Sequence, residues 1–188
     1  MNKNICVVGA GYWGNNHIRT LKRLNALKGI VELDDNILKN FLNKYPGVQG
    51  YSSIEDALLG DYDGFIIATP AKTHFEIAKI IIKAQKHLLI EKPMTLSIEE
   101  ARELVVLSEI NKVNVMVGHV LLFHPAVKKI KEMIENDEIG DLQYLYSNRL
   151  NLGKVRTEEN VFWSFAPHDI AIFQYLTGSV PKKINAIG

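Results

Sequence analysis

The sequence predicts an α/β protein organised around a doubly wound parallel sheet, and three observations carry this prediction. Short apolar runs alternate with helix-like stretches from residue 4 to residue 118, which is the rhythm of successive β-α-β units. The first apolar run, residues 5–8, leads directly into residues 9–14, whose sequence is GAGYWG. An acidic residue, Glu32, follows the second run 23 positions after Gly9, close to the spacing of about 20 found in dinucleotide-binding units. Together these features predict a Rossmann fold.

The three glycines of the first turn each have a mechanical reason. Gly9 lets the chain turn sharply off the strand, and Gly11 lets the backbone approach a pyrophosphate without a Cβ in the way. Gly14 lets the following helix, expected over residues 15–24, pack closely on the sheet. The N-terminal amides and the dipole of that helix would hold phosphate groups. The turn therefore predicts a nucleotide site.

The second strand, expected over residues 28–33, indicates which dinucleotide the site prefers. A carboxylate at the position of Glu32 accepts hydrogen bonds from the adenosine ribose hydroxyls and repels a 2′-phosphate. We therefore expect NAD rather than NADP. Asp34 and Asp35 lie close by, so Asp34 is the alternative ribose ligand, and a solvated acid at a strand end is the other explanation for Glu32.

The rest of the first part continues the alternation of strands and helices. Strands are expected at residues 62–68, 87–90 and 113–117, and helices at residues 37–45, 54–59, 73–84 and 98–110. The strand segments are continuously apolar, as buried parallel strands are. This pattern predicts a domain over residues 1–120.

Beyond residue 120 the rhythm changes, and residues 121–188 are expected to form the start of a second α/β domain. Helices are expected at residues 126–135 and 162–176, strands at residues 142–150 and 183–187, and a polar loop at residues 151–160. This leaves the sheet of the second part unfinished.

Composition excludes several classes of function. Of the 188 residues, 47% are hydrophobic and 23% are charged, as in ordinary soluble globular proteins. The net charge of +1 argues against nucleic acid or an anionic membrane as a partner. The single cysteine, Cys6, lies in the first strand and is expected to be a buried small residue, so no disulfide or cysteine-based metal site is expected. With no signal peptide or membrane span, we expect a cytoplasmic protein without a metal.

Several motifs, taken in order, resemble those of the Gfo/Idh/MocA oxidoreductases, which are named for glucose-fructose oxidoreductase and inositol dehydrogenase. The matching segments are Gly9 to Gly14, Ala68-Thr69-Pro70 with His74, Glu91-Lys92-Pro93, Gly118-His119, and His168. The stretch from Glu158 to Ile170 is similar to the branch that oxidises UDP-N-acetylglucosamine uronate at its 3-position.

This resemblance implies NAD as the cofactor, a UDP-linked sugar as the substrate and a place in surface polysaccharide synthesis. It also implies that residues 1–120 bind NAD and that residues 121–188 are part of a domain for substrate and oligomer contacts. Members of the family are considerably longer than this chain. We therefore expect a homo-oligomer that binds NAD and oxidises its substrate poorly.

Lys92 is the first candidate for proton transfer. Oxidation of a secondary alcohol needs a base for the hydroxyl proton, and Lys92 lies just past the carboxyl end of a strand, where ligands of such sheets collect. A partly desolvated lysine beside a positive nicotinamide would have a lowered pKa. The resemblance assigns Lys92 the same role and suggests a cis bond before Pro93. Glu91 is expected on the ribose side of the cofactor or as a solvated acid.

His168 is the second candidate. It lies four residues after Ser164, so both would project from one face of a helix. The family usually has aspartate at this earlier position, and Ser164 is the main departure from its pattern. A serine forms hydrogen bonds with substrate or histidine but does not hold an imidazolium electrostatically. We therefore expect Lys92 and His168 to transfer protons and Ser164 to position them.

The remaining candidates carry less weight. Thr69, Pro70 and His74 resemble the family's turn under the nicotinamide ribose, although His74 is alternatively a plain helix-start histidine. His119 is expected near nicotinamide or substrate. Arg149 and Lys154 are candidates for an anionic sugar nucleotide. Tyr12 and Trp13 would cover the pyrophosphate or pack on the second domain, and His17 and His87 are expected to be structural.

Three functions remain open. The leading prediction is an NAD-dependent dehydrogenase acting on a UDP-linked uronic acid. A free sugar or inositol dehydrogenase of the same family is the enzymatic alternative. A non-catalytic NAD-binding module is the third, because Ser164 replaces the family's aspartate.

Overall fold

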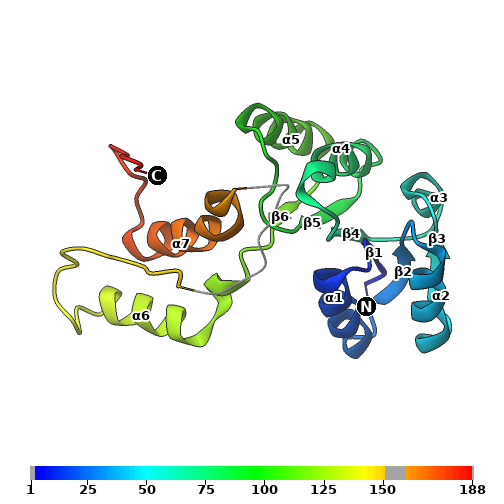
Figure 1. The fold of residues 1–188 in the computed structure, drawn as a ribbon, viewed down its shortest axis with the longest axis horizontal. Helices are drawn as coiled ribbons and strands as arrows, with labels where there is room; N and C mark the ends of the chain where they lie inside the picture. Colours follow the sequence, from blue (N-terminus) through cyan, green and yellow to red (C-terminus); the bar gives the residue numbers. More distant parts are fainter. Residues whose placement is uncertain (1–2, 151–159, 188) are drawn as a thin grey trace. The chain divides into compact units, whose positions relative to one another are not determined.

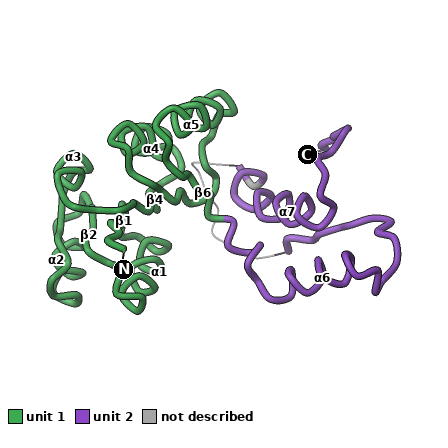
Figure 2. The backbone as a smooth tube through the Cα atoms, turned by 180° about the vertical axis from the view of Figure 1, so that it is seen from behind, with its two compact units in different colours: residues 1–118 green, residues 119–188 purple. Residues whose placement is uncertain are grey.

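The computed structural model describes residues 3–150 and 160–187. The chain divides into two compact units, Met1–Gly118 and His119–Gly188, which Figure 2 draws in green and purple. Unit 1 contains a sheet with flanking helices, and the described part of unit 2 contains helices joined and followed by irregular segments (Figure 1). None of the helices formed by the described residues has the length and apolar character needed to cross a membrane.

Unit 1 is built on a six-stranded parallel sheet with the strand order β3-β2-β1-β4-β5-β6 (Figure 1). The strands are β1 (Ile5–Val8), β2 (Leu27–Val31), β3 (Gln49–Tyr51), β4 (Gly64–Ile67), β5 (His87–Ile90) and β6 (Val115–Val117). All five pairings are parallel, which confirms the predicted doubly wound fold. The order reverses between β1 and β4, so the carboxyl ends of these strands border the crevice where ligands bind in such sheets. The edge strand β3 was not predicted.

Helices cover both faces of this sheet. They are α1 (Tyr12–Arg23), α2 (Asp35–Lys44), α3 (Ile54–Leu58), α4 (His74–Lys83) and α5 (Ile98–Asn111), with a 3₁₀ turn at Ala71–Thr73. One core contains Ile18 and Leu21 of α1 with Leu38 of α2, and the other contains Ile81 of α4 with Leu104 of α5. Successive residues of a strand point to opposite faces, so each central strand contributes to both cores.

The thiol of Cys6, in β1, shows how burial in these cores affects a titratable side chain. Cys6 is fully buried, and its burial raises the pKa of the thiol to about 12. The thiolate is therefore scarce at neutral pH, and Cys6 behaves as a small core residue.

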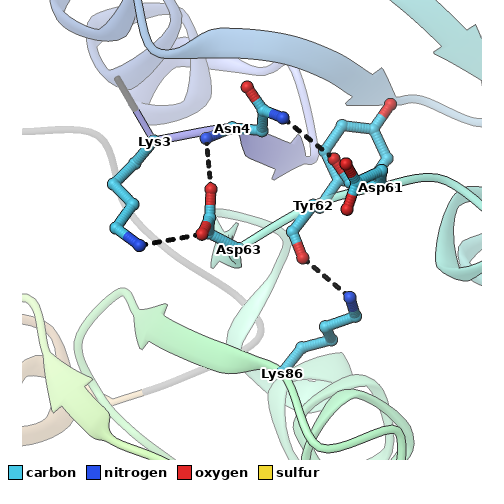
Figure 3. Close-up of polar contacts among 6 residues, drawn as sticks. All are labelled: Lys3, Asn4, Asp61, Tyr62, Asp63 and Lys86. Carbon is cyan, nitrogen blue, oxygen red and sulfur yellow. Dashed lines mark hydrogen bonds and ion pairs between the residues drawn. The ribbon is translucent and has the colours of Figure 1, made fainter. Parts of the chain in front are cut away.

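Polar contacts hold the amino ends of three strands together, at the edge opposite the crevice (Figure 3). Asp63 lies just before β4, and Lys3 and Asn4 lie just before β1. The Asp63 carboxylate accepts hydrogen bonds from Asn4 N–H at 2.7 Å and from Lys3 Nζ at 2.9 Å. Lys86, just before β5, donates from Nζ to the Tyr62 carbonyl at 2.8 Å. The hydrogen bond from Asn4 N–H, followed by the one from Lys3, holds the pKa of Asp63 below its usual range. These contacts favour the observed strand register. They involve the amino ends of the strands, so these residues take no part in the crevice at the carboxyl ends.

Unit 2 contains two helices in its described residues, α6 (Pro125–Glu135) and α7 (Val161–Thr177), after a 3₁₀ turn at Val120–Phe123. Gly178, at φ +63°, ends α7, as is common at helix C-termini. The strands predicted at residues 142–150 and 183–187 are not formed. A strand requires a hydrogen-bonded neighbour, and no strand pairing is present among the described residues of this unit.

Candidate functional site

The glycine turn between β1 and α1 is as tight as its sequence predicts. Gly9 has φ +90°, a conformation that favours glycine. A Cβ on Gly14 would lie 1.9 Å from the Gly9 carbonyl oxygen, so no side chain fits there. A Cβ on Gly11 would meet nothing within 4 Å. Gly9 and Gly14 therefore serve the packing of the turn, whereas Gly11 faces open space.

A pocket of about 500 Å³ opens at the carboxyl ends of β1, β2 and β4. Five of the predicted cofactor residues line it, and these are Gly9, Gly11, Glu32, Thr69 and Pro70. Its other walls are largely apolar and include Leu33, Ile37, Ile54 and Ile77. An apolar pocket with a few polar groups at one side suits a flat heterocycle joined to a polar chain.

The carboxylate of Glu32 is oriented at this pocket by two backbone groups. Ala10 N–H donates to Oε2 at 2.8 Å, and Asp34 N–H donates to Oε1 at 3.1 Å. The side chain of Asp34 has a different task, because its Oδ1 accepts from Asn36 N–H at 2.8 Å and Ile37 N–H at 3.1 Å at the start of α2. Asp34 is thus a helix cap, and of the two acids only Glu32 lines the pocket.

His74 belongs to the framework of the pocket, not to its lining. It is 1% exposed, and its ring nitrogens lie 2.8 Å from the Pro93 carbonyl oxygen and 2.9 Å from the Thr69 carbonyl oxygen. Carbonyl oxygens only accept, so an imidazolium donates to both and a neutral ring to one. The buried ring links two turns through these backbone contacts, and a contact of His74 with the cofactor stays a prediction.

The Glu91-Lys92-Pro93 segment follows β5 at the same edge of the sheet. The Lys92–Pro93 peptide bond is cis, as the resemblance suggested, and Lys92 is half-buried. Glu91 is 7% exposed and lies 2.7 Å from His17 Nε2. A solvated acid at this position is therefore wrong, and His17, expected to be merely structural, is a direct partner of the segment.

Tyr12 and Trp13 lie on the first turn of α1 with much of their surface exposed, 83% and 42%. Their ring centroids are 5.9 Å apart in an edge-to-face arrangement. Neither residue lines the pocket of unit 1. His87, by contrast, accepts a hydrogen bond from Asn114 N–H at 3.0 Å at the opposite end of β5, in keeping with a structural role.

In unit 2, two predicted site histidines come together. The rings of His119 and His168 are 6.5 Å apart between centroids and nearly perpendicular. Ser164, one turn before His168 on α7, is buried. The structure thus groups His119, Ser164 and His168 within one unit, although His119 is 49 residues from His168 in the chain.

Arg149 is engaged by a residue that the sequence analysis did not consider. Its Nε donates to Asp169 Oδ2 at 2.7 Å, and Ser147 Oγ donates to Oδ1 at 2.7 Å. Burial raises the pKa of Asp169, but the hydrogen bonds from Arg149 and Ser147 outweigh burial and hold that pKa below its usual range. Asp169 directly follows His168 in the motif, which was the available signal. Lys154 lies outside the described residues.

Metal chemistry has no ready site in the part of the chain that the structure describes. No group of three or more His, Cys, Asp or Glu side chains is arranged there to hold a metal ion. The polar side chains that line the unit 1 pocket are instead those of Glu32, Glu55, Thr69 and Thr73, and with the first amides of α1 they suit hydroxyl and phosphate groups.

Comparison with known proteins points to the same kind of ligand. The family model described as "Oxidoreductase family, NAD-binding Rossmann fold" matches residues 3–119. The UDP-N-acetylglucosamine 3-dehydrogenase of Acidithiobacillus ferrooxidans is 30% identical over 183 residues, covering 97% of this chain and 56% of that protein. The inositol 2-dehydrogenase of Corynebacterium glutamicum is 28% identical over 180 residues, covering 92% and 53%. This chain thus spans about half the length of these curated relatives.

Similar solved structures include complexes that hold both a cofactor and a sugar nucleotide. The WlbA dehydrogenase of Chromobacterium violaceum, in complex with NADH and UDP-GlcNAcA, is 25% identical to this chain, with a TM-score of 0.69. The match covers 74% of this chain and 41% of that protein.

Proposed function

Because the chain belongs to the Gfo/Idh/MocA oxidoreductase family, we propose that it binds NAD in the unit 1 pocket and oxidises a secondary hydroxyl group of a nucleotide-linked sugar. The observation that carries this proposal is the joint position of Gly11 and Glu32 in one pocket. The space beside Gly11 accommodates a pyrophosphate near the first amides of α1. Glu32 offers carboxylate oxygens to ribose hydroxyls. The residues present therefore fit a dinucleotide.

The chain's own contribution to the chemistry is assigned to Lys92. When bound, NAD supplies an acceptor for a hydride from the carbon that bears the hydroxyl group. Lys92 accepts or relays the hydroxyl proton at Nζ, because its half-buried side chain follows β5 at the carboxyl edge of the sheet, where ligands of such sheets bind. The shared link of His74 to the Thr69 and Pro93 carbonyls keeps the turn after β4 and the turn that carries Lys92 together.

In unit 2, His168 is proposed to contact the substrate and share in proton transfer. The ring of His119 lies next to that of His168, with 6.5 Å between their centroids. Ser164, buried on the preceding turn of α7, positions these groups through its hydroxyl. Arg149, whose Nε is held by Asp169, is proposed to pair with an anionic group of the substrate.

A UDP-linked N-acetylglucosamine uronate, oxidised at its 3-position, is the proposed substrate. Two observations support this choice, namely the relative whose name is UDP-N-acetylglucosamine 3-dehydrogenase and the WlbA structure in complex with UDP-GlcNAcA. The alternative, a free polyol, is supported by the inositol 2-dehydrogenase relative.

The test is a titration followed by an assay with two substrates. NAD is added while intrinsic tryptophan fluorescence is followed, because Trp13 lies on the first turn of α1 beside the glycine turn. NADH formation is then measured with UDP-N-acetylglucosamine uronate and with myo-inositol. Turnover with the UDP-sugar alone supports the proposal, turnover with inositol alone selects the alternative, and NAD binding without turnover of either selects a non-catalytic binding module.

Glu32→Ala is expected to narrow the preference for NAD over NADP, because the charge that repels a 2′-phosphate is removed. The wild-type chain is expected to bind NAD more tightly than NADP in parallel fluorescence titrations. Asp34→Ala is the matched control, since Asp34 caps α2, and it should leave the preference unchanged. Equal binding of both cofactors by the wild type, or a loss of preference in the Asp34 variant alone, contradicts the assignment.

We also propose that the chain self-associates. Unit 2 leaves large apolar side chains such as Tyr144, Leu150 and Ile184 exposed, and apolar surface of this kind favours association. Light scattering at several protein concentrations should show a mass above that of one chain. A constant monomer mass rejects this proposal without affecting the proposed activity.

A further inference from the structure

The Glu91 carboxylate is buried next to the proposed proton acceptor. Glu91 follows the last residue of β5 and precedes Lys92, and only 7% of it is exposed. A buried carboxylate is unfavourable unless it is hydrogen-bonded or paired with a charge. The partner of this carboxylate therefore matters for the segment that carries Lys92.

The partner comes from the helix that follows the glycine turn. His17 Nε2 lies 2.7 Å from Glu91 Oε1, and both side chains are largely buried. His17 stands three residues after Gly14, at which α1 approaches the turn too closely for any side chain. The close packing at Gly14 holds α1 near the sheet, and His17 extends this contact to the segment after β5.

The last residue of unit 1, Gly118, also lies beside the Glu91 carboxylate. A Cβ on Gly118 would lie 3.2 Å from the carboxyl carbon and from both oxygens of Glu91. Gly118 N–H donates to the Ile90 carbonyl at 2.8 Å, which keeps the strand end beside the carboxylate. The absence of a side chain at Gly118 therefore leaves the space that the Glu91 carboxylate occupies.

The second carboxylate oxygen contacts the backbone of the lysine itself. Lys92 N–H donates to Glu91 Oε2 at 3.3 Å, while Oε1 is engaged by His17. We propose that His17 is a positioning residue for Lys92: it holds the Glu91 carboxylate on α1, and so fixes the backbone and the local charge beside the lysine amine. This inference rests on the proposed role of Lys92.

The proposal makes a specific prediction about the reactivity of Lys92. Without His17, the carboxylate loses its partner on α1 and is free to turn toward the adjacent lysine. An opposite charge nearby favours the protonated amine, which is not nucleophilic. His17→Ala should therefore slow the acetylation of Lys92 by about threefold or more at a fixed, mildly alkaline pH. His17→Gln, whose side-chain amide also donates to a carboxylate, should restore the rate.

The experiment is competitive labelling of the whole chain with trace acetic anhydride, quantified peptide by peptide by mass spectrometry. Lys83, exposed at the end of α4, serves as the internal reference in every sample. His87→Ala is the matched control, because it removes a histidine with a backbone hydrogen bond at the other end of the same strand. This control should label like the wild type. Melting temperatures, measured by circular dichroism, show whether each variant is folded.

A double variant tests whether the effect passes through the charge of Glu91. In a Glu91→Gln background the neutral amide has no charge to present to Lys92, so His17→Ala should no longer slow labelling. An unchanged Lys92 rate in folded His17→Ala protein, or an equal effect with and without the Glu91 charge, overturns the proposal. Labelling requires neither NAD nor turnover. A wild-type chain that fails to bind NAD therefore defeats the proposed function while leaving the labelling result interpretable.

Discussion

Gly14→Ala is expected to destabilise unit 1 severely and to abolish NAD binding as a consequence. The new Cβ would lie 1.9 Å from the Gly9 carbonyl oxygen, and this oxygen belongs to a backbone that is itself held by the hydrogen bond from Gly9 N–H to the Val31 carbonyl at 2.8 Å. Neither group moves without separating α1 from the sheet. Overpacking of this kind costs about 3 kcal/mol of unfolding free energy. Urea denaturation followed by circular dichroism measures the loss.

Gly11→Ala is the matched control, and it should separate folding from binding. A Cβ at this position meets nothing within 4 Å, and the φ of −66° at Gly11 suits alanine. The variant should therefore unfold at the same urea concentration as the wild type. Its NAD affinity should nevertheless fall by about tenfold or more, because the methyl group occupies the path of the pyrophosphate. Equal stability of the two variants would contradict the packing role of Gly14, and undiminished affinity in Gly11→Ala would contradict the placement of the phosphates.

Lys92→Ala is expected to lower turnover by a factor of about 10² to 10⁴, which is the usual contribution of a general base. The affinity for NAD should remain nearly unchanged, because Lys92 does not line the pocket in which the dinucleotide is proposed to bind. The rate of NADH formation with the UDP-sugar is compared with the wild type under identical conditions, and affinity is measured by the fluorescence titration.

Lys83→Ala is the control for this measurement, since it removes an exposed lysine from the end of α4. It should change neither affinity nor turnover. If Lys92→Ala turns over at the wild-type rate, the proton is accepted by His168 or by water. If both affinity and turnover fall together, Lys92 contributes to cofactor binding and its role as a base is not supported.

Some parts of unit 1 follow from local sequence. The alternation of apolar runs and helical stretches predicts the parallel sheet, because buried parallel strands and their crossover helices each have a characteristic pattern. The glycine turn was predicted from residues 9–14, because the contact that excludes a side chain from Gly14 is made with the Gly9 carbonyl oxygen, a few positions away in the chain. The strand β3 was missed because it has three residues, Gln49–Tyr51, of which only the tyrosine is apolar.

Other features depend on contacts between residues that are distant in the chain. Which acid faces the pocket was open between Glu32 and Asp34, and it is decided by the amides that reach each carboxylate. The strands expected at residues 142–150 and 183–187 have strand-like composition but no pairing among the described residues. Strand propensity alone does not form a strand, because its backbone groups require a neighbour.

The sequence by itself determined the fold class, the glycine turn and the place of Lys92 just past the end of a strand, since each depends on spacing along the chain. Only the tertiary structure decided what the histidines do. His17 meets Glu91 across 74 positions, and His74 joins the Thr69 and Pro93 carbonyls. An imidazole both donates and accepts, so its sequence neighbours do not reveal its partner. The partner is selected by the packing of α1 and α4 on the sheet, which brings buried polar groups within hydrogen-bond distance of these rings.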